Sequence, residues 1–388
     1  MRLWLAMAAL CLAACGASGA PSTAPATRVA AALPRQAGDW MELTPAPTTI
    51  DGQVVTATCS NFPGTNAAYR FWAKRGATNR LVVYFDGGGA CWDDATCSAP
   101  HTVHSAEGDN TYYKAELLPA DNPRQLQGIF DVNDARNPLR DWSFVFVPYC
   151  TGDVHSGSNS ATYTNPSTHQ PFTIEHRGAD NFRVIMAWIR DNFAAPEDIL
   201  VTGSSAGAYG AATHYAEVRD AFPSGRAFML GDAGQGVTTP DFVAVRNRTW
   251  NFQLPAAVFG ANAQGTADDD LLGRVAAHYP GDRFAQYTTA LDHTQIGFYS
   301  LMTRGDACRE WTEKMSRDLT RRELRGNFRA YVAAGESHTI LRSPLFYTEQ
   351  SGGMAFSQWL AAMLSNTGTG WDTRACPECM APQRACRH

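Results

Sequence analysis

Short apolar runs alternate with segments of helical periodicity from about residue 37 onward. The runs at 81–85 and 144–147 are continuously apolar and bounded by turn residues, as expected for strands buried on both faces of a sheet. Runs at 199–202 and 328–333 are further strand candidates. Strands that alternate with helices indicate βαβ units, so the pattern predicts an α/β fold with a mostly parallel central sheet and helices on both faces.

Three segments have the periodicity of helices packed on such a sheet. Residues 181–193 carry an apolar face, and residues 354–364 contain four large apolar side chains. The segment 206–221 is unusually small along one side, which favours close packing against strands. The stretch 238–279 has broken periodicity and many polar residues. It is either a cap over a functional site or a set of peripheral helices.

Composition narrows the class of protein. The 388 residues are 44% hydrophobic and 18% charged, enough for a large buried core without disordered bulk. The net charge of −5 comes from 32 basic and 37 acidic residues, and no long basic run is present. Nucleic acid is therefore not expected as a partner, because binding its backbone requires clustered Lys and Arg.

The N-terminus has the features of an export signal. Arg2 precedes an apolar run at 3–12 that is too short to span a bilayer, which predicts a signal peptide over 1–14. The ending Leu-Ala-Ala-Cys resembles a lipobox with Cys15 as the lipidated residue, although an ordinary secretory signal cleaved further along is the alternative. We expect a flexible tether over 15–36 and a single domain over 37–388. The protein is then exported, either anchored through a lipid in the periplasm or at the cell surface, or secreted, and membrane contact is expected only through that lipid.

Eight cysteines remain after Cys11 and Cys15 are set aside, and an even number in an oxidising compartment predicts disulfides. The short loop between Cys91 and Cys97 is the first pairing to expect. The tail contains Cys376, Cys379 and Cys386 with His388, which could alternatively form a zinc site or a redox pair.

A strand-turn-helix pattern carries the first candidate for chemistry. The strand candidate at 199–202 runs into Gly203-Ser204-Ser205-Ala206-Gly207 and then into the small-sided helix. A nucleophile at such a sharp turn has a strained backbone, so its neighbours two positions away must be tiny. Ser205 is the expected nucleophile, and the Ala206 N–H at the helix start is placed to stabilise an oxyanion.

A glycine run supplies the second candidate. Asp86-Gly87-Gly88-Gly89 directly follows the strand candidate at 81–85, where the oxyanion hole of an α/β-hydrolase is completed. A phosphate-binding loop or a plain turn is the rival interpretation. The Walker lysine and the dinucleotide-binding glycine spacing are both absent.

The base and its orienting acid should lie further along the chain. His338 follows the strand candidate at 328–333, as the base of this fold does. Asp232 and Asp292 compete for the role of the acid, with the run 268–270 as an outsider. Asp292 fits the usual chain order better, because the acid normally follows a later strand.

Five segments together resemble the pectin acetylesterases and Notum-type carboxylesterases, which are α/β-hydrolases. The segments are Tyr-Phe-Asp-Gly-Gly-Gly-Ala-Cys-Trp at 84–92, Val-Pro-Tyr-Cys-Thr-Gly-Asp-Val-His-Ser-Gly at 147–157, Gly-Ser-Ser-Ala-Gly at 203–207, Leu-Asp-His-Thr-Gln at 291–295 and Ser-His-Thr at 337–339. The sequence departs from the family at Gly89-Ala90, where Gly-Trp is common, and at Ser204, where plant members have Cys.

The resemblance implies roles for particular residues. It implies a triad of Ser205, Asp292 and His338, and an oxyanion hole formed by backbone N–H groups. The implied oxyanion donors are Gly88, Gly89 and Ala206, and the implied disulfides are Cys91–Cys97 and Cys59–Cys150.

We therefore expect a serine carboxylesterase that acts through an acyl-enzyme without a metal or organic cofactor. The expected substrate is an ester, an O-acetyl or other short acyl group on a carbohydrate such as an acylated polysaccharide. A depolymerase or lipase acting on aliphatic polyesters or lipids is the main alternative, and a peptidase is a weaker one. A non-catalytic carbohydrate-binding surface lipoprotein is disfavoured, because a binder needs no intact Ser, Asp and His.

Overall fold

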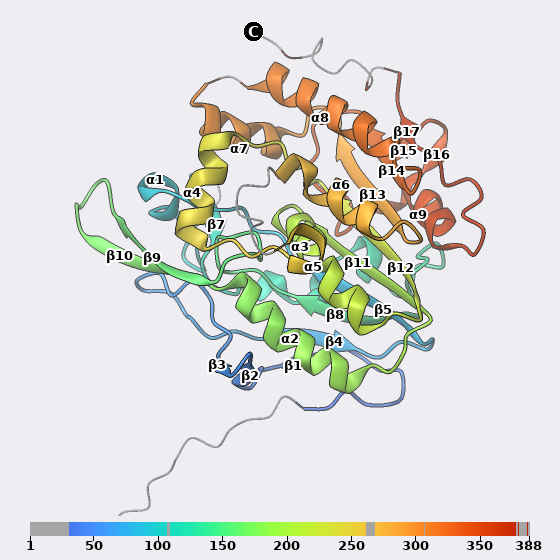
Figure 1. Ribbon diagram of the computed structural model, residues 1–388, viewed down its shortest axis with the longest axis horizontal. Coiled ribbons are helices and arrows are strands. Elements are labelled where there is room, and N and C mark those ends of the chain that lie inside the picture. Colours follow the sequence, from blue (N-terminus) through green and yellow to red (C-terminus); the bar gives the residue numbers. More distant parts are fainter. Residues whose placement is uncertain are drawn as a thin grey trace, which may run out of the picture.

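The computed structural model describes residues 31–106, 109–260, 268–305, 307–377, 379 and 386. The signal peptide, Cys15, most of the tether and His388 lie outside the described residues. The core is a nine-stranded sheet with the order β1-β4-β8-β5-β11-β12-β13-β14-β17 (Figure 1). Its strands are β1 (Met41–Leu43), β4 (Phe71–Lys74), β5 (Arg80–Phe85), β8 (Ser143–Val147), β11 (Asp198–Ser204), β12 (Arg226–Asp232), β13 (Arg283–Thr289), β14 (Phe328–Ala333) and β17 (Arg374–Ala375).

The sheet is parallel from β8 to β17, and β1 and β4 add an antiparallel edge. The four strand candidates correspond to β5, β8, β11 and β14, so the prediction of an α/β fold is confirmed. Two-stranded ribbons surround this sheet: β2 (Thr48–Ile50) with β3 (Gln53–Val55), β6 (Pro100–His101) with β7 (Tyr113–Lys114), β9 (Asn159–Thr164) with β10 (Pro171–His176), and β15 (Gln350–Ser351) with β16 (Met354–Ala355).

Helices cover both faces of the sheet. They are α1 (Asp94–Cys97), α2 (Gly178–Asn192), α3 (Ala206–Ala221), α4 (Pro240–Trp250), α5 (Ala256–Phe259), α6 (Asp268–His278), α7 (His293–Thr303), α8 (Cys308–Glu323) and α9 (Phe356–Leu364), with short 3-10 turns η1 (Pro119–Asp121), η2 (Pro123–Gln125), η3 (Gly128–Phe130) and η4 (Pro344–Tyr347). Phe284 of β13 contacts Tyr215 of α3, whereas Tyr287 of the same strand contacts Phe356 of α9. Residues three apart on a strand face opposite sides, so α3 and α9 cover opposite faces.

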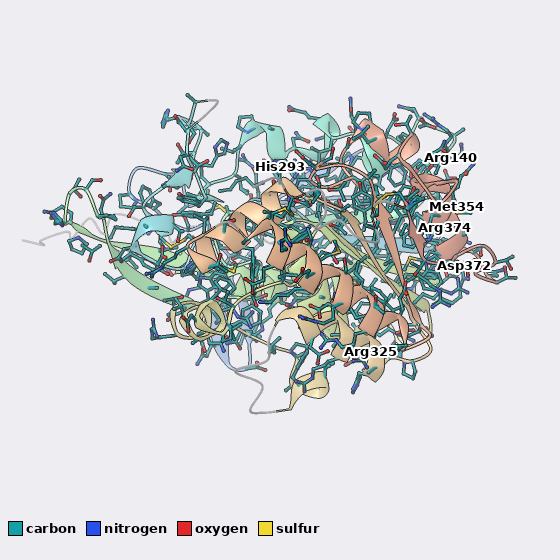
Figure 2. All side chains as sticks on the ribbon, turned by 90° about the horizontal axis from the view of Figure 1, so that it is seen from above. Arg140, His293, Arg325, Met354, Asp372 and Arg374 are labelled. Carbon is teal, nitrogen blue, oxygen red and sulfur yellow. A yellow bond between two sulfur atoms is a disulfide. The ribbon has the colours of Figure 1, made fainter. Side chains whose placement is uncertain are left out.

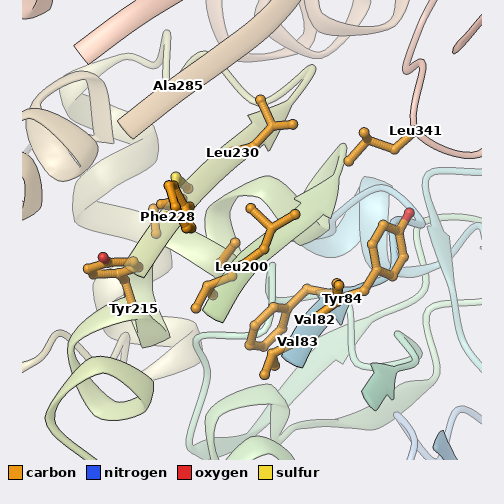
Figure 3. Packing of buried hydrophobic residues seen from close by; sticks show 14 of the residues in the cluster. Val82, Val83, Tyr84, Leu200, Tyr215, Phe228, Leu230, Ala285 and Leu341 are labelled. Atoms are coloured by element: carbon orange, nitrogen blue, oxygen red, sulfur yellow. The ribbon is translucent and has the colours of Figure 1, made fainter. Parts of the chain in front are cut away.

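Side chains on both faces of the central strands are buried. Val82, Val83 and Tyr84 are consecutive and all fully buried, as are Leu200 and Leu230 on the neighbouring strands. Figure 3 shows these side chains stacked across the strands. This burial explains why the sequence pattern in these strands is continuous rather than alternating.

The predicted helices form with shifted ends. The segment 181–193 is α2, which begins three residues earlier, and 206–221 is α3 as expected. The helix expected at 354–364 begins only at Phe356, because Met354 and Ala355 pair with β15. The stretch 238–279 contains α4, α5 and α6, of which α6 packs against α3. Residues 261–267 lie outside the described part of this stretch.

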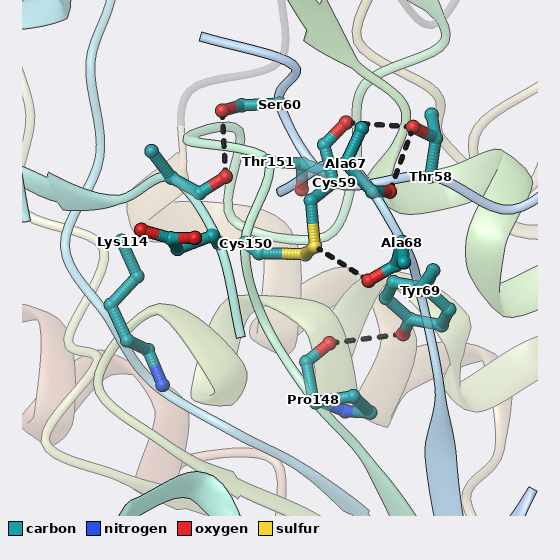
Figure 4. Close-up of a disulfide and its surroundings, with 12 residues drawn as sticks. Thr58, Cys59, Ser60, Ala67, Ala68, Tyr69, Lys114, Pro148, Cys150 and Thr151 are labelled. Atoms are coloured by element: carbon teal, nitrogen blue, oxygen red, sulfur yellow. Dashed lines mark hydrogen bonds between the residues drawn. A yellow bond between two sulfur atoms is a disulfide. The ribbon is translucent and has the colours of Figure 1, made fainter. Parts of the chain in front are cut away.

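Four disulfides join the described cysteines: Cys59–Cys150, Cys91–Cys97, Cys308–Cys386 and Cys376–Cys379. The first ties the segment before β4 to the end of β8, beside the hydrogen bond from the Tyr69 hydroxyl to the Pro148 carbonyl (Figure 4). The tail cysteines are paired with each other and with Cys308, so the structure contradicts the zinc-site alternative for them. Within the part of the chain that is described, none of the helices combines the length and apolarity needed to cross a bilayer.

Candidate active site

Ser205 occupies a strained turn between β11 and α3. Its backbone has φ 57° and ψ −124°, a region that costs a residue with a side chain about 1–3 kcal/mol. The glycines two positions away are required by close approach of the backbone. A Cβ on Gly207 would lie 2.0 Å from the Phe85 carbonyl oxygen, and one on Gly203 would lie 2.3 Å from the Gly207 carbonyl oxygen. The glycines thus allow the turn that presents Ser205 at the carboxyl end of the sheet.

His338 and Asp292 are joined at the same end of the sheet. Nδ1 of His338 lies 3.0 Å from Oδ1 and 2.9 Å from Oδ2 of Asp292, which is fully buried. Asp292 also caps α7, where it accepts hydrogen bonds from the backbone N–H of Gln295 at 2.9 Å and from its Nε2 at 3.0 Å. These donors fix the carboxylate, and the carboxylate in turn orients the imidazole.

The other imidazole nitrogen of His338 could exchange a proton with a group in the cavity. Nε2 of His338 is buried and has no hydrogen-bond partner among the described residues. His338 and Ser205 line the same two cavities. The structure gives the Ser205 hydroxyl no hydrogen bond to another described side chain, and such bonds often tighten only when substrate binds.

Asp232 lies nearby but has different partners. Its buried carboxylate accepts hydrogen bonds from the Ser204 hydroxyl at 2.6 Å and from the N–H groups of Ile340 and Leu341 at 3.0 Å each. Burial raises the pKa of Asp232, and the hydrogen bonds from Ser204, Leu341 and Ile340 oppose that shift. Asp232 therefore links the residue before Ser205 to the loop that carries His338, and the imidazole hydrogen-bonds to Asp292 instead.

The other sequence candidates lie elsewhere. Asp270 on α6 pairs with Arg325 at 3.7 Å, and the side chains of residues 268 and 269 lie outside the described set. Figure 2 shows Arg325 well apart from His293, the first residue of α7. His293 is exposed and bonds the Glu336 carbonyl oxygen through Nδ1 at 2.7 Å.

The glycine loop faces Ser205 from β5. Gly89 has φ 74°, and its N–H and that of Gly88 hydrogen-bond to no described residue. Flanking bonds hold the loop, from the Ala90 N–H to the Tyr112 carbonyl oxygen at 2.9 Å and from the Lys114 N–H to the Gly88 carbonyl oxygen at 2.9 Å. The Ala206 N–H at the start of α3 lies directly after Ser205, so these three groups are the candidate oxyanion donors.

Ser205 and His338 lie between two spaces of opposite character. The first, which we call the apolar pocket, has a volume of about 70 Å³. Its wall consists mainly of large apolar side chains: Trp92, Val154, Tyr209, Val237, Phe242, Phe298, Met302 and Trp311. The second, the polar hollow, has a volume of about 640 Å³, and its polar lining includes Lys114, Asp121, Gln125, Gln127 and Arg342. The α4 helix borders the apolar pocket through Phe242, so part of the stretch 238–279 does lie beside this site.

Sequence reasoning missed two polar groups around the site. One is the chain from the Tyr84 hydroxyl to Ser204 at 2.9 Å and on to Asp232. The other is an ion cluster around Asp86, the residue directly before the glycine run. A charged residue between a buried strand and three glycines was the available signal for that cluster.

One group of potential metal ligands occurs among the described residues. Sulfur atoms of Cys91 and Cys97 lie within 4.8 Å of a His176 nitrogen. The two cysteines form a disulfide, and both His176 nitrogens are hydrogen-bonded, to the Thr151 carbonyl oxygen and the Tyr163 hydroxyl. This group is therefore occupied by internal bonds rather than set up to bind a metal.

Comparisons with known proteins agree on one family. The pectinacetylesterase family model matches residues 43–265, more than half of the chain. Pectin acetylesterase 11 of Arabidopsis thaliana is 27% identical over 175 residues, which cover 44% of this chain and 41% of that protein. Palmitoleoyl-protein carboxylesterase notum2 of Xenopus laevis is 28% identical over 158 residues, covering 39% of this chain and 28% of that protein.

The chain thus matches less than half the length of these curated relatives. The solved structure of the Wnt deacylase Notum from Drosophila superposes with a TM-score of 0.58 at 16% identity, over 88% of this chain and 96% of that one. At this identity the likeness concerns the fold.

Proposed function

The chain belongs to the pectinacetylesterase family, and we propose that it is a serine carboxylesterase that removes a short acyl group, O-acetyl first of all, from a carbohydrate. The observation that carries the proposal is the pairing of His338 with buried Asp292 through Nδ1. Its Nε2 has no hydrogen-bond partner in the described part of the chain, and His338 and Ser205 line the same cavity. A nucleophile, a base and an orienting acid in this arrangement are the requirements of acyl transfer.

In the proposed reaction, His338 Nε2 takes the hydroxyl proton as Ser205 attacks the ester carbonyl carbon. The tetrahedral oxyanion is stabilised by the N–H groups of Gly88, Gly89 and Ala206. His338 then protonates the leaving alkoxide, and the carbon–oxygen ester bond breaks. Water, deprotonated by His338, releases the acid by the same route and restores Ser205. The mechanism requires no metal and no organic cofactor.

The two spaces beside Ser205 support the assignment of substrate. An acyl group fits the apolar pocket, where aromatic walls and a volume of about 70 Å³ favour a short chain. The alcohol portion then occupies the polar hollow, where the amide side chains of Gln125 and Gln127 suit the hydroxyl groups of a sugar. Hydrolysis of long lipids or aliphatic polyesters would need a deeper apolar channel.

A fluorophosphonate probe tests the class of enzyme. We expect wild-type protein to be labelled on Ser205 and Ser205→Ala to be unlabelled. An unlabelled, folded wild-type protein would instead favour a non-catalytic surface binder. Assaying the acids released from acetylated polysaccharides, aryl esters and polyesters then tests the substrate class. Preferential release of acetate from polysaccharide is expected, and preferential depolymerisation of polyester would favour the alternative.

We also propose that the protein is exported and anchored through a lipid on Cys15, a residue outside the described part of the chain. The disulfides support an oxidising compartment. Cys15→Ser should move active protein from the membrane fraction to the soluble fraction. Soluble wild-type protein with an N-terminus beyond Cys15 would instead indicate ordinary secretion.

A further inference from the structure

Two carboxylates and two cations form a buried cluster beneath the glycine loop. Nζ of Lys114 lies 2.6 Å from Oδ2 of Asp86 and 2.6 Å from Oδ1 of Asp121. Nη1 of Arg342 donates to the other carboxylate oxygen of Asp86. Asp86 is fully buried, and Asp121 and Lys114 are less than a tenth exposed. The four formal charges cancel, so the cluster gives no net attraction for a charged substrate.

One side of the cluster fixes the glycine loop. Asp86 directly precedes the glycines, and the Lys114 N–H donates to the Gly88 carbonyl oxygen at 2.9 Å. The Lys114 side chain also packs against Gly88, since a Cβ placed there would lie 2.5 Å from Lys114 Cε. Lys114 thus supports Gly88 from below through both its backbone and its aliphatic chain.

The other side fixes the loop that carries His338. Arg342 lies four residues after His338, and its guanidinium is bound to Asp86. The intervening N–H groups of Ile340 and Leu341 are bound to Asp232. Asp86 is therefore connected, through one carboxylate oxygen each, to the support of the oxyanion loop and to the histidine loop.

Asp86 needs both cations. Burial alone would raise the pKa of Asp86, but Arg342 and then Lys114 outweigh burial and lower the pKa below its ordinary value. A fully buried carboxylate that loses one such partner is strongly destabilised. The ion pairs therefore hold the two loops in one fixed relation.

We propose that Asp86, Lys114 and Arg342 are positioning residues that align the N–H groups of Gly88 and Gly89 with His338 for the reaction. This inference rests on the proposed esterase function. Lys114 and Arg342 would act through the loops they hold, and neither is assigned a step with substrate. Misplaced oxyanion donors reduce transition-state binding more than ground-state binding, because the charge they stabilise develops only in the transition state.

The test compares two variants that both lack the Lys114–Asp86 ion pair but differ in the net charge of the cluster, so that effects on kcat can be separated from effects on stability. Lys114→Met leaves a buried excess of negative charge, so both the melting temperature and kcat should fall. Lys114→Met/Asp121→Asn restores neutrality, so the melting temperature should recover in large part. The bond from Lys114 to Asp86 remains absent, so kcat on an aryl acetate should stay reduced, roughly ten- to hundred-fold, with KM little changed. Affinity for a boronic acid that mimics the tetrahedral intermediate should fall in parallel with kcat.

Arg342, whose side chain is about a third exposed, offers a second variant. Arg342→Gln should reduce kcat at similar KM, and Arg342→Lys should recover part of the loss. Arg219→Met is the matched control: it removes the 2.8 Å ion pair between Arg219 in the last turn of α3 and Asp282, and neither residue lines either cavity. It should lower the melting temperature and leave kcat unchanged.

Recovery of kcat together with stability in the Lys114→Met/Asp121→Asn protein would overturn the inference, as would wild-type kcat in Lys114→Met and Arg342→Gln. In either case the cluster would be structural only. Wild-type protein is assayed first with the fluorophosphonate probe and the aryl acetate. Its inactivity would overturn the proposed function and this inference together, whereas an active wild type with unaffected variants overturns only the inference.

Discussion

Nδ1 of His338 is 2.9 Å from Oδ2 of Asp292, whose carboxylate is fully buried and held by both N–H donors of Gln295. A carboxylate at Nδ1 favours the tautomer with the proton on that nitrogen, which leaves Nε2 free to accept one. The pairing thus supports the proposed role of His338 as the base toward Ser205. The carboxylate oxygens of Asp232, in contrast, accept hydrogen bonds from one hydroxyl and two backbone N–H groups.

The first prediction concerns these two acids. Asp292→Asn keeps the side-chain shape but presents an amide to Nδ1 and favours the wrong tautomer, so kcat on an aryl acetate should fall roughly ten-thousand-fold. Asp232→Asn should impair kcat only moderately and lower the melting temperature, because an amide group would face hydrogen-bond donors. Circular dichroism checks folding of both variants. If Asp232→Asn were the more severely inactivated of the two, the assignment of the acid would be wrong.

The second prediction concerns the oxyanion loop. Gly89 has a positive φ, and a Cβ there would lie 1.9 Å from the Tyr112 carbonyl oxygen. Gly89→Ala should displace the loop and reduce kcat on the order of a hundred-fold, the loss expected when one oxyanion donor is removed. Gly281→Ala is the control, since nothing lies within 4 Å of its added Cβ. Equal kcat in the two folded variants would contradict an oxyanion role for Gly89.

The sequence predicted those parts of the molecule that depend on local pattern. The strand β11, the turn at Ser205 and the helix α3 are consecutive in the chain. The apolar run predicted the strand, the glycine spacing predicted the turn, and the small residues predicted the helix. The edge strands β1 and β17 have only 3 and 2 residues, too few for a periodic pattern. Chain order favoured Asp292 as the acid but left Asp232 as a competitor, because Asp232 ends β12 and Asp292 follows β13 at the same edge of the sheet.

The ion cluster and the pocket walls could not be predicted in this way. Asp86, Lys114 and Arg342 are far apart in the chain, and their meeting depends on how β5, β7 and the loop after β14 pack. The apolar pocket likewise combines Trp92 with Phe298 of α7 and Trp311 of α8. Its size is a result of side-chain packing, which no single segment encodes.

The third prediction concerns acyl length. Phe298 lies over the glycine loop, with its ring tip 3.3 Å from the position of a Cβ on Gly89, and its ring contacts Trp92 at 6.3 Å between centroids. Phe298→Ala should enlarge the apolar pocket. The ratio of kcat/KM for the butyrate or hexanoate aryl ester to kcat/KM for the acetate ester should then rise by roughly ten-fold. Leu301→Ala changes an exposed residue of the same helix and should leave the ratio unchanged. An unchanged ratio in Phe298→Ala would place the acyl group elsewhere.

The last prediction concerns stability in acid. Burial lowers the pKa of His155 and of His176 from 6.5 to about 3. Between these values the unfolded chain binds protons that the folded protein does not, so each residue reduces the free energy of unfolding as the pH falls from about 6.5, by about 1.4 kcal/mol per pH unit. Asp153 acts in the opposite direction, because burial raises its pKa from 3.8 to about 6 and its contribution to stability falls as the pH rises through that range. The raised pKa of Asp232 has the same effect as that of Asp153, so the pH dependence of wild-type stability combines opposite contributions.

A variant isolates the contribution of one histidine. His176→Gln removes one buried imidazole and should be less stable at pH 8, but its free energy of unfolding should fall by about 1.4 kcal/mol less than that of wild type for each pH unit between 6 and 4. Urea unfolding of both proteins across this range measures the difference, and parallel curves would mean that His176 is protonated in the folded protein.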